Sequence, residues 1–101
     1  MVTPTDRPDD ITICKAALEQ WGIVGQVVMV FEEMAELQKE LTKYLRGQRH
    51  FSRIAEEIAD VEIMLLQMMI LFDCADQVAE KRDQKLTRLW GRLKGEERCA
   101  F

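Results

Sequence analysis

The chain has 101 residues, of which 32% are charged and 48% apolar, and this balance predicts one soluble globular domain, 1–101. The formal net charge of −4 argues against general nucleic-acid binding, which uses a basic surface. Three widely spaced cysteines match neither a disulfide framework nor a zinc site, so we expect a cytoplasmic protein. We expect no signal peptide in the polar first residues, and the longest apolar run, 63–72, is too short to span a membrane.

The pattern after the proline-containing arm predicts helices throughout, because glycines are few and no strand-like alternation occurs. A first helix is expected to start after Asp9 or Asp10, either of which can cap it, and to end near Trp21. A second helix is expected over about 25–45, and Gly47 follows it as a C-terminal stop.

A third and a fourth helix complete the prediction. The polar turn 47–50 leads to a third helix that Ser52 caps and that ends near residue 71. The fourth helix is opened by Asp73 or Asp76 and ends near residue 93.

The expected fold is all-α, a small antiparallel helical bundle of about four helices, with a flexible arm (1–9) and tail (95–101). The second half of the third helix, 63–72, is apolar on nearly every side. Two explanations stay open: central placement in the monomer, or a subunit interface. The small size of the chain favours the interface, and we expect a homodimer or homotetramer.

Two pairs of acids, each spaced by three residues, fall on the second and third helices: Glu33 with Glu36, and Glu57 with Asp60. Residues three apart share one helical face, and a hairpin would bring the two faces together. Four clustered carboxylates repel one another and favour a bound cation. Their hard oxygen atoms suit Mg²⁺, with Mn²⁺ as a second possibility.

The acids lie in line with apolar residues rather than on a purely polar face. Glu57 shares a stripe with Val61 and Met64, while Glu33 is in line with Val30 and Leu37. Burying an unpaired carboxylate costs on the order of several kcal/mol. The compensating charge is either a set of basic side chains or a metal ion, and the pattern leaves both open.

Basic residues recur at helical spacing on the fourth helix, and one more precedes the second acidic pair by a turn: Lys81, Lys85, Arg88, Arg92 and Arg53. Such a strip is often a solvated face. Beside a carboxylate cluster it has a second use, because Mg²⁺ bridges carboxylates to phosphate oxygens while Lys and Arg neutralise the remaining phosphate charge. The predicted ligand is a polyphosphate.

With these residues in view, the chain resembles the MazG-like members of the all-α nucleoside triphosphate pyrophosphohydrolase superfamily. The resemblance runs over about 17–93 and rests on FEEMAEL (31–37), RIAEEIADV (53–61) and EKRDQKLTR (80–88). It implies Mg²⁺-dependent hydrolysis of nucleoside triphosphates to a monophosphate and pyrophosphate, as in enzymes that clear unwanted nucleotides.

The resemblance also implies roles for single residues. The implied metal ligands are Glu33, Glu36, Glu57 and Asp60, and the implied phosphate-binding residues are Arg53, Lys85 and Arg88. The basic strip adds Lys81 to the predicted phosphate-binding residues. The proton acceptor is one of Glu32, Glu36 and Glu57. Asp83 departs from the family pattern, which often has Asn there, and an acid would repel phosphate unless it is turned away.

Two further interpretations accompany this one. Trp21 is a candidate for stacking on a nucleobase, and packing in a core or interface is its alternative role. The whole chain has an alternative reading as a non-enzymatic dimerisation or nucleotide-sensing module. In that case the acidic pairs form ion pairs with Arg53, Lys81 and Lys85 and need no metal.

Overall fold

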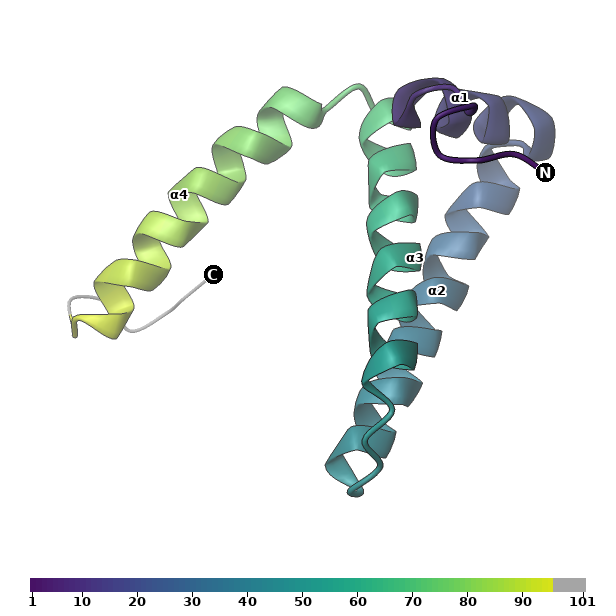
Figure 1. Ribbon diagram of the computed structural model, residues 1–101. Helices are drawn as coiled ribbons and strands as arrows, with labels where there is room; N and C mark the ends of the chain where they lie inside the picture. The colour runs from purple at the N-terminus through teal and green to yellow at the C-terminus, as the bar shows by residue number, and fades with distance from the viewer. Residues whose placement is uncertain (96–101) are drawn as a thin grey trace.

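A computed structural model describes residues 1–95, which form four α-helices and no strand. The helices are α1 (Asp10–Trp21), α2 (Ile23–Leu45), α3 (Phe51–Leu71) and α4 (Ala75–Leu93), as Figure 1 shows. The all-α prediction is confirmed, whereas the predicted flexible tail lies almost wholly outside the described residues. None of the helices within 1–95 has a stretch both long and apolar enough to cross a bilayer.

The start of α1 and the junction with α2 follow from local hydrogen bonds. The Asp9 carboxylate accepts a bond from the Thr12 N–H at 2.8 Å, which confirms Asp9 as the N-cap. α2 begins at Ile23, two residues earlier than predicted. The reason is that the Gly22 carbonyl already accepts the Gln26 N–H at 3.1 Å, so helical bonding starts at Gly22.

The end of α2 is a Schellman motif centred on Gly47. The Gly47 N–H donates to the Tyr44 carbonyl at 2.9 Å, and the Gln48 N–H donates to the Lys43 carbonyl at 3.0 Å. Gly47 has φ +94°, a left-handed conformation that favours glycine. The predicted stop at Gly47 is therefore confirmed.

The predicted cap of α3 is wrong. α3 starts at Phe51, and the His50 carbonyl accepts the Ile54 N–H at 3.1 Å. Ser52 consequently lies inside the first turn, where its hydroxyl has no cap position to fill. His50 holds the N-cap position without a side-chain bond.

The predicted caps of α4 are also wrong. Cys74 holds the N-cap position, and its carbonyl accepts the Val78 N–H at 2.8 Å. Asp73 instead ends α3: it has φ +49°, and its N–H donates to the Ile70 carbonyl at 3.2 Å. Asp76 lies in the first turn of α4, where its negative charge suits the helix dipole.

α2 and α3 lie side by side and make the most extensive contact between elements, with α1 packed across one end of the pair (Figure 1). The turn 46–50 lets α3 run back alongside α2. α4 leaves at a steep angle and, among the described residues, touches no helix except α3. One chain therefore forms a three-helix unit with a projecting fourth helix.

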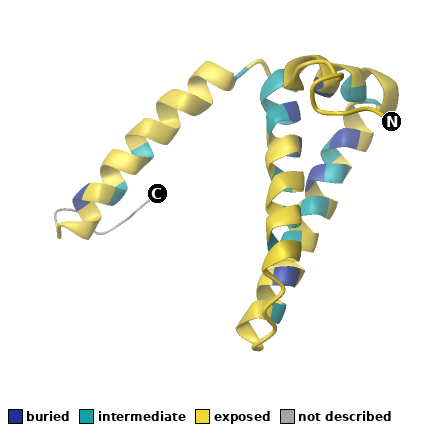
Figure 2. Cartoon of the chain, in the orientation of Figure 1, coloured by how far each residue is buried: buried dark blue, intermediate teal, exposed yellow. Residues whose placement is uncertain are grey.

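Few side chains are buried in this arrangement, as the mostly yellow cartoon of Figure 2 shows. Cys14, Val30 and Met64 are the buried apolar residues of the described part. Within the apolar run 63–72, Met64 and Gln67 are buried while Ile63, Leu65 and Phe72 stay exposed. The run thus serves the α2–α3 contact on one side and leaves apolar surface on the other.

Two glycine substitutions test this local analysis. Gly47→Ala places an L side chain at positive φ and should destabilise the protein by about 1–2 kcal/mol. Gly25→Ala lies within α2, where an added Cβ meets no atom within 4 Å, and should stabilise by about 1 kcal/mol. Urea unfolding of both variants measures the difference, and equal shifts would contradict the assigned turn.

Candidate metal centre

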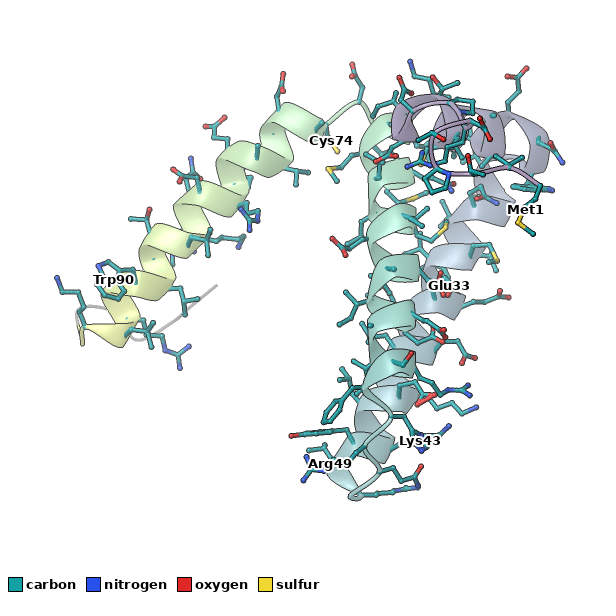
Figure 3. All side chains as sticks on the ribbon, viewed as in Figure 1. Met1, Glu33, Lys43, Arg49, Cys74 and Trp90 are labelled. Carbon is teal, nitrogen blue, oxygen red and sulfur yellow. The ribbon has the colours of Figure 1, made fainter. Side chains whose placement is uncertain are left out.

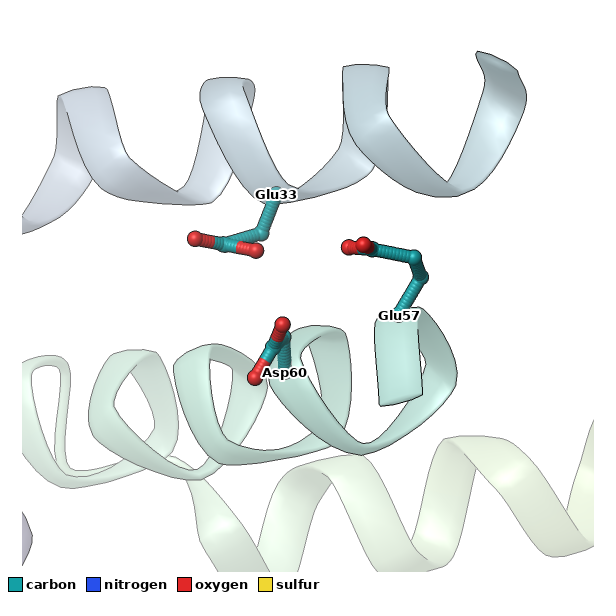
Figure 4. Close-up of side chains that lie close together, drawn as sticks. All are labelled: Glu33, Glu57 and Asp60. Carbon is teal, nitrogen blue, oxygen red and sulfur yellow. The ribbon is translucent and has the colours of Figure 1, made fainter. Parts of the chain in front are cut away.

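Three acidic side chains from two helices point toward one another between α2 and α3 (Figure 4). Glu33 comes from α2, while Glu57 and Asp60 come from α3, and one carboxylate oxygen of each lies within 4.8 Å of the others. Glu33 and Glu57 are half-buried and Asp60 is exposed. The structure therefore brings together three of the four predicted ligands; we call these three residues the acidic group.

Glu36, the fourth predicted ligand, lies beside the acidic group without joining it. Glu36 is exposed, and its negative charge contributes to raising the pKa of both Glu33 and Glu57. Glu32, the neighbour of Glu33, is exposed and lies about 100° around the helix from it. Glu36 is therefore near enough to act with the acidic group, and Glu32 faces a different direction.

The acidic group is electrostatically unfavourable as it stands. Desolvation raises the pKa of Glu33, and the charges of Asp60 and Glu57 raise it further. The pKa of Glu57 is raised by desolvation first and then by the charges of Asp60 and Glu36, which Arg53 only partly offsets. A positive ion among these oxygens would relieve both effects.

The donor set fits a hard divalent cation. All three donors are carboxylates, the ligand type of Mg²⁺ and Mn²⁺, and no cysteine or histidine is among them. Around one Mg²⁺, adjacent oxygens are about 3 Å apart and opposite ones about 4 Å, so the three carboxylates would have to move closer together to share one ion. Exposure of Asp60 leaves one side of the group open to water and ligand.

Glu40 belongs to the same region but has its charge balanced, a role that the sequence interpretation did not assign. It is only 2% exposed; its Oε1 accepts bonds from Arg53 Nε at 2.9 Å and Lys43 Nζ at 3.4 Å, and its buried Oε2 has no protein partner. Desolvation raises the pKa of Glu40, yet these two cations outweigh it and lower the pKa overall. The sequence feature that could have indicated this role is the position of Glu40 four residues after Glu36, on the same side of the helix.

Arg53, predicted to bind phosphate, is anchored at the edge of the acidic group. Within residues 1–95 its hydrogen bond to Glu40 uses Nε, and the side chain remains 62% exposed. The positive charge of Arg53 also acts on Glu57 and reduces the extent to which the pKa of Glu57 is raised. The guanidinium is thus close to the acids while much of it still faces solvent.

The basic residues of α4 are not brought to the acidic group within one chain. Lys81, Lys85 and Arg88 lie on α4, which projects away from the hairpin, and Figure 3 shows Trp90 of this helix far from Glu33. Asp83 is exposed on the same helix. A shared site would need a second copy or a movement of α4.

Trp21 is the last residue of α1 and is 62% exposed. It lines a shallow groove with Pro8, Ala17 and Gln20, at the α1 end of the molecule. Packing within a core is therefore not its role in the single chain. Its predicted stacking on a nucleobase stays a prediction.

Comparisons with known proteins give no relative, because no protein-family model, curated protein or solved structure matches the chain. The functional interpretation accordingly rests on the motifs and on the acidic group.

The acidic group predicts a stability gain when one of its charges is removed. Without metal at neutral pH, Glu33→Gln should raise the melting temperature, because the carboxylate with a raised pKa is unfavourable once ionised. The gain should shrink as the pH falls through that raised pKa, since the native carboxyl is then also neutral. Glu40→Gln should instead lower the melting temperature, because it weakens a paired buried charge. The two variants should shift the melting temperature in opposite directions. A lower melting temperature in both would contradict electrostatic repulsion within the acidic group.

A divalent cation should stabilise the folded chain. Mg²⁺ or Mn²⁺ at about 100 times its dissociation constant would add about 2.7 kcal/mol, because it binds the folded state alone. Glu57→Gln should abolish this increase, whereas Glu56→Gln, one residue away and exposed, should retain it. Thermal melts with and without metal measure both, and an equal response of the two variants would exclude this site.

Proposed function

We propose that the protein is a Mg²⁺-dependent, cytoplasmic nucleoside triphosphate pyrophosphohydrolase that releases pyrophosphate and a nucleoside monophosphate. The observation that carries the proposal is the acidic group, which joins Glu33 of α2 to Glu57 and Asp60 of α3. The pKa values of Glu33 and Glu57 are both raised in it. The sequence resemblance to MazG-like enzymes supplies the reaction, and the group supplies ligands of the required chemistry.

In this proposal the metal supplies charge neutralisation and orientation for the triphosphate. Glu33, Glu57 and Asp60 would hold it, and Glu36 would complete the ligand set or act from beside it. Among the candidate proton acceptors Glu32, Glu36 and Glu57, Glu36 is favoured, because it lies next to the acidic group without belonging to it. It can accept a proton from the attacking water.

Arg53 would bind a phosphate oxygen at the edge of the acidic group. Its bond to Glu40 uses Nε, so the two terminal nitrogens of the guanidinium can donate to a ligand. Glu40 would then be a positioning residue, because it limits where the guanidinium can go. Both cations bind its Oε1, whereas its buried Oε2 has no protein partner.

In this proposal, oligomer assembly brings three basic residues of α4 to the site: Lys81, Lys85 and Arg88. Since α4 reaches only α3 in one chain, these residues would meet a triphosphate in a homodimer or homotetramer, within a closed antiparallel bundle. Such an arrangement would also decide whether Asp83 faces the phosphates. The non-enzymatic alternative has less support, because Arg53 pairs with Glu40 rather than with the two acidic pairs.

The test is release of pyrophosphate from a panel of ribo- and deoxyribonucleoside triphosphates with Mg²⁺. Asp60→Asn should reduce the rate by on the order of 100-fold or more, because it removes a metal ligand, and Glu56→Gln should keep it. Product analysis should find pyrophosphate rather than orthophosphate.

Two outcomes would count against the proposal. Equal rates in Asp60→Asn and wild type would place the activity elsewhere. No release by wild type with Mg²⁺ or Mn²⁺, although the metal raises its melting temperature, would leave a metal-binding protein without this activity.

A further inference from the structure

The chain around the turn between α2 and α3 carries cations and no acids. Residues 41–55 contain four of the 14 Lys and Arg residues of the chain and none of its 18 Asp and Glu residues. The rest of the chain is accordingly more acidic than the net charge of −4 indicates. That net charge argues against nucleic-acid binding by the whole surface, but it does not describe this end of the hairpin.

Two of the cations near the turn are not balanced by carboxylates of the protein. Lys43 and Arg53 both bind Glu40, which offsets one of their two charges. Arg46 and Arg49 are exposed, and within residues 1–95 neither of them forms an ion pair. α3 also begins here without a side-chain cap, so its first N–H groups add to the positive potential. The turn end of the hairpin therefore attracts anions.

Two aromatic rings lie among these cations. The ring centroids of Tyr44 and Phe51 are 6.1 Å apart, and the guanidinium carbon of Arg49 lies 5.1 Å from the centroid of the Tyr44 ring. Tyr44 is 39% exposed and Phe51 is 59% exposed, so both rings are accessible. We call Lys43, Tyr44, Arg46, Arg49 and Phe51 the basic tip. Figure 3 shows Lys43 and Arg49 at the turn end of the hairpin.

This combination fits the two repeating groups of a single nucleic-acid strand. Phosphates pair with Lys and Arg, while unstacked bases stack on aromatic rings and on guanidinium planes. A duplex offers no free base faces to the rings, because its bases are stacked on one another. An anionic membrane suits the basic tip less, because insertion of the Tyr44 ring would carry the Arg49 charge toward hydrocarbon. An acidic peptide would pair with the charges and leave the rings unused.

We propose that the basic tip binds single-stranded nucleic acid. Two or three phosphates contact Lys43, Arg46 and Arg49, and a base stacks on the surface formed by Tyr44 and Phe51. The acidic remainder of the chain repels the strand, which confines the contact to this end of the hairpin. Binding needs no metal, and Arg53, which belongs to the proposed hydrolase site, is not part of the basic tip. This proposal and the hydrolase proposal can therefore fail separately.

The test is fluorescence anisotropy of a labelled single strand of about 12 nucleotides, as RNA and as DNA, titrated with the full chain in EDTA. EDTA removes metal from the candidate metal centre, so metal-dependent hydrolysis does not contribute. Two or three phosphate contacts predict an affinity that falls about 7- to 20-fold between 50 and 200 mM salt. A duplex of the same sequence should bind at least about fivefold more weakly, because it loses the contribution of one stacked base.

Variants of the basic tip separate its charges from its rings. Arg46→Gln combined with Arg49→Gln should weaken binding about tenfold or more at 50 mM salt, because two phosphate contacts are lost. Tyr44→Leu should weaken binding by about fivefold or more, because it removes a stacking surface and keeps an apolar side chain. Circular dichroism identifies a variant that unfolds, and Phe51→Leu then replaces Tyr44→Leu.

Matched controls make the same changes on other helices. Lys15→Gln combined with Arg82→Gln removes the same charge from exposed positions on α1 and α4. Trp90→Leu removes a ring that is 61% exposed and that Lys94 overlies at 5.6 Å. Both controls should bind the strand as wild type does.

Four outcomes would overturn the proposal. The first is no binding by wild type at 50 mM salt, and the second is equal weakening by the tip variants and the controls. The third is equal affinity for duplex and single strand, or displacement of the strand by ATP at equal phosphate concentration, since either would show that the tip binds phosphate alone. The fourth is binding to vesicles of anionic phospholipid without binding to the strand, which would assign the tip to a membrane surface.

Discussion

The packing of α2 against α3 is the contact on which the rest of the structure depends. It buries Val30 and Met64, and it brings Glu33 of one helix to Glu57 and Asp60 of the other. A helix–helix contact of this size is normally apolar, yet this one also buries Gln26, Glu40 and Gln67. Two of their buried oxygens, Glu40 Oε2 and Gln67 Oε1, have no hydrogen-bond partner among the described residues.

Two kinds of carboxylate occur within two turns of α2, and the contrast between them supports a bound cation. Glu40 is almost completely buried, and its pKa is lowered because Arg53 and Lys43 balance its charge. Glu33 is less buried, yet its pKa is raised, first by desolvation and then by the charges of Asp60 and Glu57, with no cation to offset them. The fold thus balances the charge of Glu40, offsets that of Glu57 only in part, and leaves the acidic group in need of an external positive charge, for which a divalent metal has the appropriate chemistry.

Local features of the fold could be predicted from the sequence because they depend on residues a few positions apart. The helical periods, the Asp9 cap and the Gly47 stop are of this kind. The short turn between α2 and α3 also made the meeting of Glu33 with Glu57 and Asp60 predictable, but not the position of Glu36 outside this group. The Ser52 cap failed because helical bonding already begins at the His50 carbonyl. A side-chain pattern does not locate a helix start to better than about two residues.

Features that depend on the path of the chain could not be predicted in this way. The chain turns from α3 toward α4 at Asp73, which has a left-handed conformation. A glycine at this position would have predicted such a conformation, whereas an aspartate does not. For that reason the sequence pattern predicted that the basic strip with Lys81 and Lys85 lies near the acids. In the structure of one chain, α4 holds this strip away from them. The Glu40–Arg53 pair depends on the register of the hairpin, because its partners are thirteen residues apart.

The central claim is that the acidic group binds a divalent cation, and Mn²⁺ titration followed by electron paramagnetic resonance tests it most directly. Free Mn²⁺ gives a strong signal that weakens when the ion is held by a protein. The account predicts saturable loss of signal with wild type, and with Glu56→Gln, but not with Asp60→Asn. Loss of signal that is the same in wild type and Asp60→Asn, or no loss in wild type, would contradict it.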